Sequence, residues 1–107
     1  MVSADSVFRA IAHPGRRKII GLLAKSSRSV KELTAQFEIS QAAISQHLKE
    51  LRKADLVSSE RVALEQRYRL TPQPLKHVLR WCDSYRSIVD PAGHMWSLGR
   101  KIKKSGK

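Results

Sequence analysis

Apolar side chains recur at helical spacing along the first half of the chain. Within residues 3–12, Val7 and Ile11 are four positions apart and therefore share one face of a helix. A residue that precedes proline is pushed out of the helical region, so this helix must end just before Pro14, which suits the first position of the next one. The pattern predicts two helices, 3–12 and about 14–25, joined by a sharp turn.

Two serines mark the starts of two further helices. Ser29 and Glu32 have the spacing of a capping box, in which each side chain satisfies a backbone N–H at the start of the helix. Ser40 is the expected N-cap of a fourth helix that extends to about Ala54. A turn of a few residues separates the third helix from the fourth, which is the spacing of a helix-turn-helix.

The periodicity changes to two after the fourth helix. Residues 56–61 and 66–70 alternate on both sides of a short break, and this predicts a β-hairpin. Pro72 and Pro74 prevent the second strand from continuing and open a last helix over about 75–89. Along that helix runs a nearly heptad apolar stripe: Leu75, Val78, Leu79, Cys82, Tyr85 and Val89.

These elements predict a mainly α fold with a β-hairpin wing, that is, a winged helix-turn-helix of five helices and two strands. We expect residues 1–90 to form a single domain, because 107 residues are too few for two cores. Residues 91–107 are rich in lysine and lack periodicity, so we expect a basic, flexible tail there.

The charge of the chain indicates what kind of partner this fold binds. There are 21 Lys and Arg against 9 Asp and Glu, a formal net charge of +12 at pH 7, and such an excess implies a polyanion. The apolar runs are far shorter than the roughly 20 residues that cross a bilayer, and no signal peptide is evident. We therefore expect a cytoplasmic protein without membrane contact. The single cysteine, Cys82, cannot form an internal disulfide.

The fourth helix has one face suited to DNA. Ile44, Leu48 and Leu51 converge on one side at about 100° per residue, and the opposite side has no acidic residue at its centre, with Glu50 at its edge. A merely solvated helix more often mixes Glu with Lys there. Glutamine can donate to and accept from adenine, small side chains allow close approach, and lysine pairs with phosphate or guanine. We predict base contacts from Gln41, Ala42, Ser45 and Gln46, and DNA-backbone contacts from Ser40 and Lys49.

Further candidates for DNA contact lie outside the centre of this face. In the hairpin, Arg61 and Arg67 are candidates for phosphate or minor-groove contact, and Gln66 is a further candidate for DNA contact. His47 points between the apolar and polar faces, so packing and phosphate contact both stay open for it. The three cations at 16–18 begin a helix, where positive charge indicates either a phosphate or acidic partner or a solvated surface.

Four segments, in order, resemble the ArsR/SmtB family of winged-helix repressors. They are AIAHPGRRKIIGLL at 10–23, SVKEL at 29–33, ISQAAISQHLKELRKADLV at 39–57 and RYRL at 67–70. The resemblance implies a homodimer, formed mainly by the first and last helices, that binds operator DNA and is often released by a metal, redox or other signal. Residues 1–90 would then combine DNA binding with dimerisation. The interface that we expect comprises Val7, Ile11, Leu75, Val78, Leu79, Cys82, Tyr85 and Val89.

The chain departs from the metal-sensing members of that family. Where some members carry cysteines in the third helix, this chain has Ser29 and Lys31, which are not soft-metal ligands. Where others hold zinc on the last helix, the matching positions are Pro72, Pro74, Tyr85 and Ile88. We therefore expect no metal site and no cofactor, and the inducer is unknown. A metal- or redox-responsive sensor with a non-standard site, such as Cys82, stays an alternative.

The sequence favours a DNA-binding regulator over an enzyme. It assembles no paired carboxylates, no phosphate-binding glycine loop and no nucleophile with a positioned base. A winged helix that binds another protein is the remaining alternative, and it would present a hydrophobic or mixed-charge fourth helix. We expect a repressor that binds double-stranded DNA as a homodimer at an inverted repeat, with half-sites about one helical turn apart, and that can regulate its own promoter.

Overall fold

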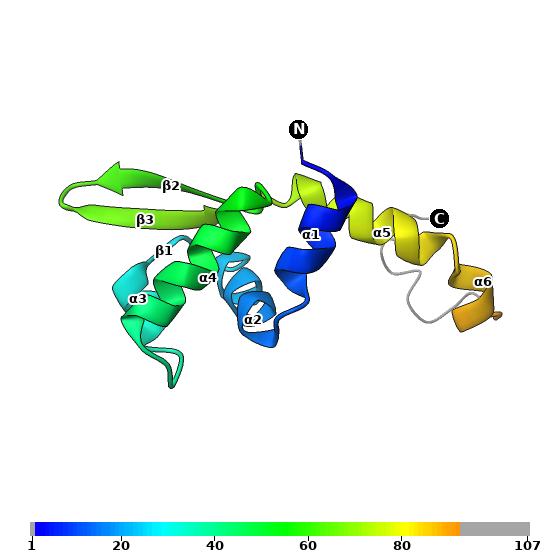
Figure 1. Ribbon diagram of the computed structural model, residues 1–107, viewed down its shortest axis with the longest axis horizontal. Coiled ribbons are helices and arrows are strands. Elements are labelled where there is room, and N and C mark those ends of the chain that lie inside the picture. The colour runs from blue at the N-terminus through cyan, green and yellow to red at the C-terminus, as the bar shows by residue number, and fades with distance from the viewer. Residues whose placement is uncertain (1, 93–107) are drawn as a thin grey trace.

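The computed structural model describes residues 2–92, and within that range it has the mainly α fold with a hairpin wing that the sequence predicts (Figure 1). Of the predicted tail, 91–107, residues 93–107 lie outside the described residues. The elements are α1 (Ala4–Ile11), α2 (Pro14–Leu23), β1 (Arg28–Ser29), α3 (Val30–Thr34), α4 (Gln41–Lys53), β2 (Val57–Val62), β3 (Glu65–Leu70), a 3-10 helix η1 (Gln73–Leu75), α5 (Lys76–Asp83) and α6 (Arg86–Val89).

Each of the first four helices begins where a side chain accepts a hydrogen bond from a backbone N–H. Ser29 and Glu32 form the predicted capping box at the start of α3, with both reciprocal bonds in place. Ser40 caps α4 through its Oγ, as expected. Ser3 caps α1 in the same way, and the Nδ1 atom of His13 caps α2. Local sequence chemistry therefore fixes where α4 starts.

The sheet has three antiparallel strands in the order β1-β3-β2, so the prediction of two strands was one short. The pair β2 and β3 runs in register from Val57 opposite Leu70 to Val62 opposite Glu65. This leaves a two-residue turn, and Ala63 within it has a φ of 60°, as tight hairpin turns require. Strand β1 has only two residues, and no periodicity of two can reveal so short a strand.

The last predicted helix, 75–89, is broken into two. Helix α5 ends at Asp83 and α6 begins at Arg86. The cause lies at Ser84, whose Oγ donates to the Trp81 carbonyl oxygen at 2.7 Å, offering that carbonyl a partner other than the helical ladder. The N–H of Tyr85 then bonds the carbonyl three residues back, which tightens the turn. The apolar stripe along 75–89 is therefore not one continuous seam.

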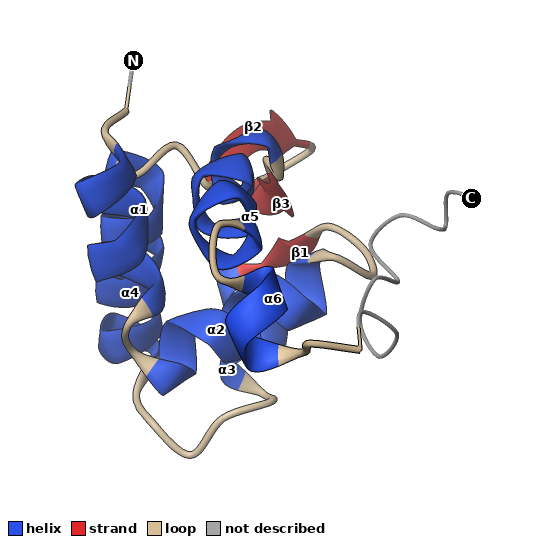
Figure 2. Cartoon of the chain, turned by 90° about the vertical axis from the view of Figure 1, so that its right-hand side faces the viewer, coloured by secondary structure: helices blue, strands red, loops and turns tan. Residues whose placement is uncertain are grey.

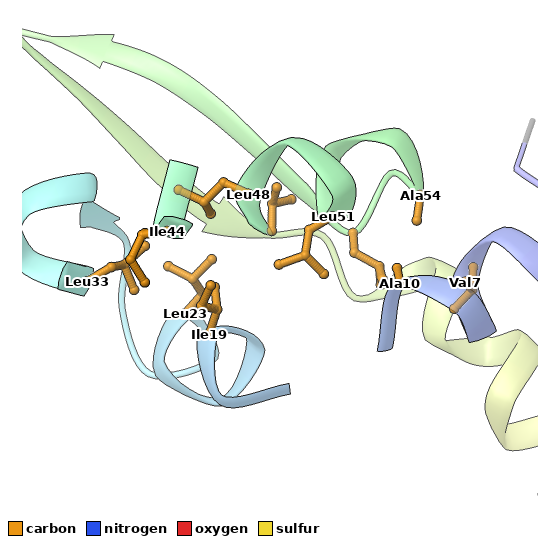
Figure 3. Close-up of a cluster of buried hydrophobic side chains, with 11 residues drawn as sticks. Val7, Ala10, Ile19, Leu23, Leu33, Ile44, Leu48, Leu51 and Ala54 are labelled. Carbon is orange, nitrogen blue, oxygen red and sulfur yellow. The ribbon is translucent and has the colours of Figure 1, made fainter. Parts of the chain in front are cut away.

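The core lies between α1, α2, α3, α4 and the base of the wing (Figure 3). Ile44, Leu48 and Leu51 of α4 are almost fully buried there, which confirms the predicted inward face. Each such side chain contributes roughly 1.5–3 kcal/mol on burial, so α4 is held firmly with its other face outward. The buried set is Val7, Ala10, Ile19, Leu23, Leu33, Ile44, Leu48, Leu51, Ala54, Leu56 and Val57.

The wing and α6 lie at opposite ends of the long axis of the molecule (Figure 1). Figure 2 looks along this axis with α6 nearest the viewer. Helices α1, α2 and α4 occupy the middle and contact one another. The arrangement places α4 between two separate surfaces, the hairpin on one side and the last helices on the other.

Candidate nucleic-acid interface

The outward face of α4 is a continuous polar surface. Its side chains are held by the helix at about 100° per residue, opposite the three buried positions of the same helix. None of the face's central positions is acidic, so nothing at its centre repels a phosphate backbone. The exposed residues on this face, all of them predicted DNA contacts, are Gln41, Ala42, Ser45, Gln46 and Lys49.

Glu50 lies at the edge of this face and holds two of its neighbours. Its Oε2 accepts a hydrogen bond from Nε2 of Gln46 at 3.1 Å and forms an ion pair with Nζ of Lys53 at 3.4 Å. The Gln46 amide nitrogen is thereby oriented toward Glu50, which leaves the amide oxygen and a second N–H for other partners. From sequence, Glu50 was predicted only to lie at the edge of the face, although its i, i+4 spacing from Gln46 could have indicated this bond.

His47 is half-buried against the start of α2. Its Nδ1 accepts a hydrogen bond from Nε of Arg16 at 3.3 Å, and its ring centroid lies 4.5 Å from that of His13. Burial lowers the pKa of His47, and the nearby His13 and Arg16 lower it further. A Cβ at Gly15 would lie 3.2 Å from Cε1 and Nδ1 of His13, so a glycine there leaves room for the His13 ring that packs on His47. These contacts favour packing over DNA contact for His47.

Two of the cations that begin α2 bind carbonyl oxygens at the ends of other segments. Nη1 of Arg17 donates to the Ile11 carbonyl oxygen at 2.8 Å, which caps the C-terminus of α1. Nζ of Lys18 donates to the Gln36 carbonyl oxygen at 2.6 Å and lies 4.5 Å from the Phe37 ring centroid. For these two residues, intramolecular carbonyls explain the positive charge that the sequence analysis attributed to an anionic partner or solvent.

The wing presents Arg61 and Gln66 on one face. They are cross-strand partners and both are exposed. Ser59, two residues before Arg61 and so on the same face, accepts hydrogen bonds from Nη1 of Arg52 and Nε2 of Gln66, each at 2.9 Å. Because Arg52 belongs to α4, this face of the hairpin continues the α4 surface. Sequence reasoning missed Ser59, whose role depends on the strand register.

Arg67 lies on the other face of the hairpin, where its bonds favour a structural role over the predicted DNA contact. Its guanidinium donates to the Ser27 carbonyl oxygen at 2.7 Å and to Glu32 and Glu65 at 3.0 and 3.1 Å, and its side chain is only 24% exposed. The hydrogen bond from the Ser29 N–H, with Arg67 beside it, holds the pKa of Glu32 below its ordinary value. Arg67 therefore joins β3 to the segment that precedes α3.

A separate apolar surface covers α5 and α6. Val7, predicted at a dimer interface, is fully buried in the core of this chain, so that assignment is corrected. Trp81 and Ile88 are exposed, and neither was among the predicted interface residues. The Trp81 ring makes edge contacts with Phe8 at 5.7 Å and Tyr85 at 5.3 Å.

The remaining predicted interface residues are of two kinds, some half-buried and some exposed. Ile11, Leu75 and Val78 are half-buried because they pack against the core, and Cys82 is also half-buried. Sequence periodicity predicted which face of the helix is apolar, but not how much of that face packs against the rest of the same chain. The exposed large apolar residues of these helices are Leu79, Trp81, Tyr85, Ile88 and Val89.

Within residues 2–92, the structure shows neither a cluster of metal ligands nor a membrane-spanning helix. In that part of the chain, no three side chains of His, Cys, Asp or Glu come together in a way that could hold a metal ion. None of the helices described there has the length and apolar character needed to span a bilayer.

A short turn before a polar, outward helix, with a hairpin beside it and a shared core behind, defines the winged helix-turn-helix class of DNA-binding folds. Residues 13–59 match the profile described as "Bacterial regulatory protein, arsR family". Together with the relatives described next, this match places the chain in the ArsR family, and the resemblance seen in the sequence is confirmed.

The relatives are named as regulators of transcription. The transcriptional repressor SdpR of Bacillus subtilis (strain 168) is 34% identical over 77 residues, which cover 72% of this chain and 86% of that protein. The HTH-type transcriptional repressor SmtB of Mycobacterium tuberculosis (strain ATCC 25618 / H37Rv) is 39% identical over 77 residues, or 72% of this chain. The match spans only 57% of the length of SmtB.

The fold has close solved counterparts. A crystal structure described as a possible transcriptional regulator for arsenical resistance superimposes with a TM-score of 0.67 at 31% sequence identity. The superposition covers 94% of this chain and 96% of that one. Near-complete coverage of both chains means that the hairpin and the last helices, and not only the helix-turn-helix, have counterparts in that protein.

Proposed function

We propose that this protein is a transcriptional repressor that acts in the cytoplasm and binds an inverted-repeat operator as a homodimer. One observation carries the proposal: α4 buries three aliphatic side chains and turns outward a surface that bears amide, hydroxyl and lysine groups and has no acidic residue at its centre. A major groove about 12 Å wide admits one helix of this kind. Gln41 and Gln46 would contact base edges there, and Ser45 and Ala42 would allow close approach.

The flanks of α4 support the same docking. Lys49 is exposed on the polar face, where it would pair with a phosphate. Arg61 and Gln66 lie on the hairpin face that continues α4, so they would reach the DNA beside the groove that α4 occupies. Arg67 has no part in this proposal, because its guanidinium is bonded within the chain.

The apolar surface of α5 and α6 supports dimerisation. Leu79 and Ile88 expose most of their side chains, and Trp81, Tyr85 and Val89 extend the same surface. An apolar hollow of about 370 Å³ lies within this surface and is lined by Trp81, Cys82, Tyr85, Ile88 and Val89. A second copy of the chain would cover it, and a two-fold dimer would place its two α4 helices one helical turn apart on the DNA.

The test is a comparison of binding to a selected operator and to random duplex. An operator is first obtained by selection from a random duplex library and by footprinting on DNA that flanks the gene. The double variant Gln41→Ala/Gln46→Ala should lose about 30-fold or more of preference for the operator, because each good bidentate base contact is worth roughly 1–3 kcal/mol and the variant removes two.

Two variants serve as controls for this measurement. Lys49→Gln should weaken binding to both DNAs alike and lower the salt slope by about 1. Gln73→Ala, at an exposed glutamine of η1, should change neither. Selection that enriches no sequence, or a glutamine double variant with wild-type preference, would contradict the proposed readout and would favour a winged helix that binds another protein.

A further inference from the structure

A cleft of about 400 Å³ lies between α1, α2 and α4, outside the polar face already described. It is within the range of small-ligand sites, roughly 300–1,000 Å³. Its polar walls are Ser6 and Arg9 from α1, Arg16 from α2, and Glu50 and Lys53 from α4. Three helices therefore direct charged side chains into one hollow.

The cleft and the wing flank α4 on different sides. On the wing side, Arg52 donates to Ser59 of β2. On the cleft side, His47 accepts from Arg16 of α2. Residues 47 and 52 are five positions apart, which is about 140° around a helix. A duplex that received α4 in its major groove would have one backbone near the hairpin and the other near this cleft.

The charges in the cleft favour a doubly negative group. Three cations and one carboxylate line it, which leaves a net charge of +2 (3 − 1). The carboxylate of Glu50 already accepts from Gln46 and pairs with Lys53, so part of its charge is balanced. A phosphate monoester carries nearly two negative charges at pH 7 and three strong acceptor oxygens. Guanidinium groups match those oxygens in a bidentate geometry.

Arg16 holds its present partners through long hydrogen bonds. Its bonds to Nδ1 of His47 and to the Ala10 carbonyl oxygen are 3.3 and 3.5 Å long, at or beyond the long end of the range for good hydrogen bonds. The adjacent Arg17 differs, since it bonds a carbonyl oxygen at 2.8 Å. A phosphate oxygen at ordinary distance would therefore compete well for Arg16.

We infer that this cleft binds a phosphoryl group through Arg9, Arg16 and Lys53. The group has two possible sources, a backbone phosphate of bound DNA or a free phosphorylated small molecule. The first source rests on the proposed function and extends its DNA footprint to the side of α4 away from the wing. The second does not depend on DNA binding.

Occupation of the cleft would alter the base-reading face. A phosphoryl group that attracts Lys53 draws it from Glu50, which also holds the Gln46 amide. A group that engages Arg16 weakens its bond to His47 on the same helix. The cleft is thus one contact away from Gln46, and its occupant would change the orientation of a predicted base contact.

The first experiment uses inorganic pyrophosphate and the full chain, without DNA. A titration followed by amide and arginine-side-chain NMR should give saturable shifts at Arg9, Arg16 and Lys53. The double variant Arg9→Gln/Lys53→Gln should weaken pyrophosphate binding at least about tenfold, because it removes two charged hydrogen-bond donors from the cleft. The matched control is Lys25→Gln/Lys76→Gln, which removes the same charge from exposed lysines elsewhere and should bind as wild type.

The second experiment measures the salt dependence of binding to random duplex for the same two variants. If DNA supplies the phosphoryl group, the cleft variant should lower the slope by about 1 to 2 and the control should not. Pyrophosphate shifts without a slope difference would assign the cleft to a free phosphorylated compound. A slope difference without pyrophosphate shifts would assign it to DNA.

Two results would overturn the inference. One is the absence of both effects, and the other is an equal effect in the cleft variant and the lysine control, because bulk charge then explains it. A wild-type chain that failed to bind any DNA would refute the proposed function, whereas the pyrophosphate titration would still decide the cleft.

Discussion

His13 and His47 both use Nδ1 as an acceptor, from the Gly15 N–H at 3.0 Å and from Arg16 at 3.3 Å. Only an imidazole that lacks a proton on Nδ1 can accept there, so the His47 ring is neutral in this arrangement, with its proton on Nε2. The His13 ring lies 4.5 Å from it, and the Arg16 guanidinium beside His47 would repel a protonated ring. The contact between α2 and α4 therefore depends on an unprotonated His47.

This contact predicts a loss of stability in mild acid. Burial, together with His13 and Arg16, holds the pKa of His47 below its ordinary value of about 6.5. The unfolded chain therefore takes up this proton at a higher pH than the folded chain does, so stability is full above about 6.5 and falls below it. Between pH of about 7.5 and 5.5, urea unfolding should show a larger loss for wild type than for His47→Gln.

His77→Gln provides the control for that measurement. His77 lies on α5, a different element from those that carry His13 and His47, so its replacement should leave the wild-type pH dependence of unfolding unchanged. If His47→Gln kept the full acid sensitivity, the neutral ring of His47 would not be its cause.

At the scale of elements, Arg67 adds a side-chain link to the β1–β3 pairing that joins the wing to the segment before α3. Its guanidinium reaches the Ser27 carbonyl oxygen and the Ser27 hydroxyl, 40 positions away in the sequence. It also pairs with Glu32, whose other bond completes the capping box of α3. One side chain therefore connects the strand β3 to the helix-turn-helix, and the hairpin cannot move far without breaking these bonds.

Arg67→Ala should destabilise the fold, and Arg69→Ala should not. The first leaves the Ser27 carbonyl without its charged donor, and such bonds contribute about 1.5–3 kcal/mol. Arg69 is 58% exposed and pairs with an equally exposed Glu60, so its loss should cost less than about 1 kcal/mol. Urea denaturation measures both free energies of unfolding. Equal losses in the two variants would mean that Arg67 is not a structural link.

The contrast between Arg61 and Arg67 indicates what the sequence could and could not predict. The helix α4 was predicted well, because Ser40 caps it locally and its buried positions repeat every three to four residues. The faces of the hairpin were not, because a register shift of one residue reverses them and the turn had no glycine or asparagine to fix it. Strand β1 pairs with residues about 40 positions away, which no local pattern reveals.

The predicted continuous helix over 75–89 was wrong for a different reason. Its apolar spacing is real, but periodicity does not register a hydrogen bond from Ser84 that ends α5 early. Periodicity also does not show whether a side chain is exposed. Val7 was therefore assigned to the dimer interface although it packs inside its own chain, and Trp81 was left out of that interface. Local chemistry thus predicted starts and faces of helices, and tertiary packing decided which faces remain open.

At the scale of the whole molecule, the two proposed contacts occupy different ends. The hairpin extends the α4 surface at one end, and α5 and α6 carry the exposed apolar side chains at the other (Figure 1). A second copy joined through α5 and α6 would therefore leave each wing free and place the two wings far apart, as an inverted repeat requires. DNA binding and dimerisation can then be disturbed separately.

That separation gives the last prediction. Leu79 and Ile88 are 67% and 74% exposed, and Leu79→Glu/Ile88→Glu should raise the dimer dissociation constant at least about 100-fold, because each aliphatic side chain buried in an interface contributes roughly 1.5–3 kcal/mol. Neither side chain belongs to the core, so circular dichroism should report wild-type helix content. The control is Leu64→Glu, which places the same charge on a 91% exposed leucine at the tip of the wing and should remain dimeric in sedimentation-velocity experiments. A doubly substituted chain that still sediments as a dimer would locate the interface elsewhere, and a monomer that kept wild-type operator affinity would remove the need for two-fold binding.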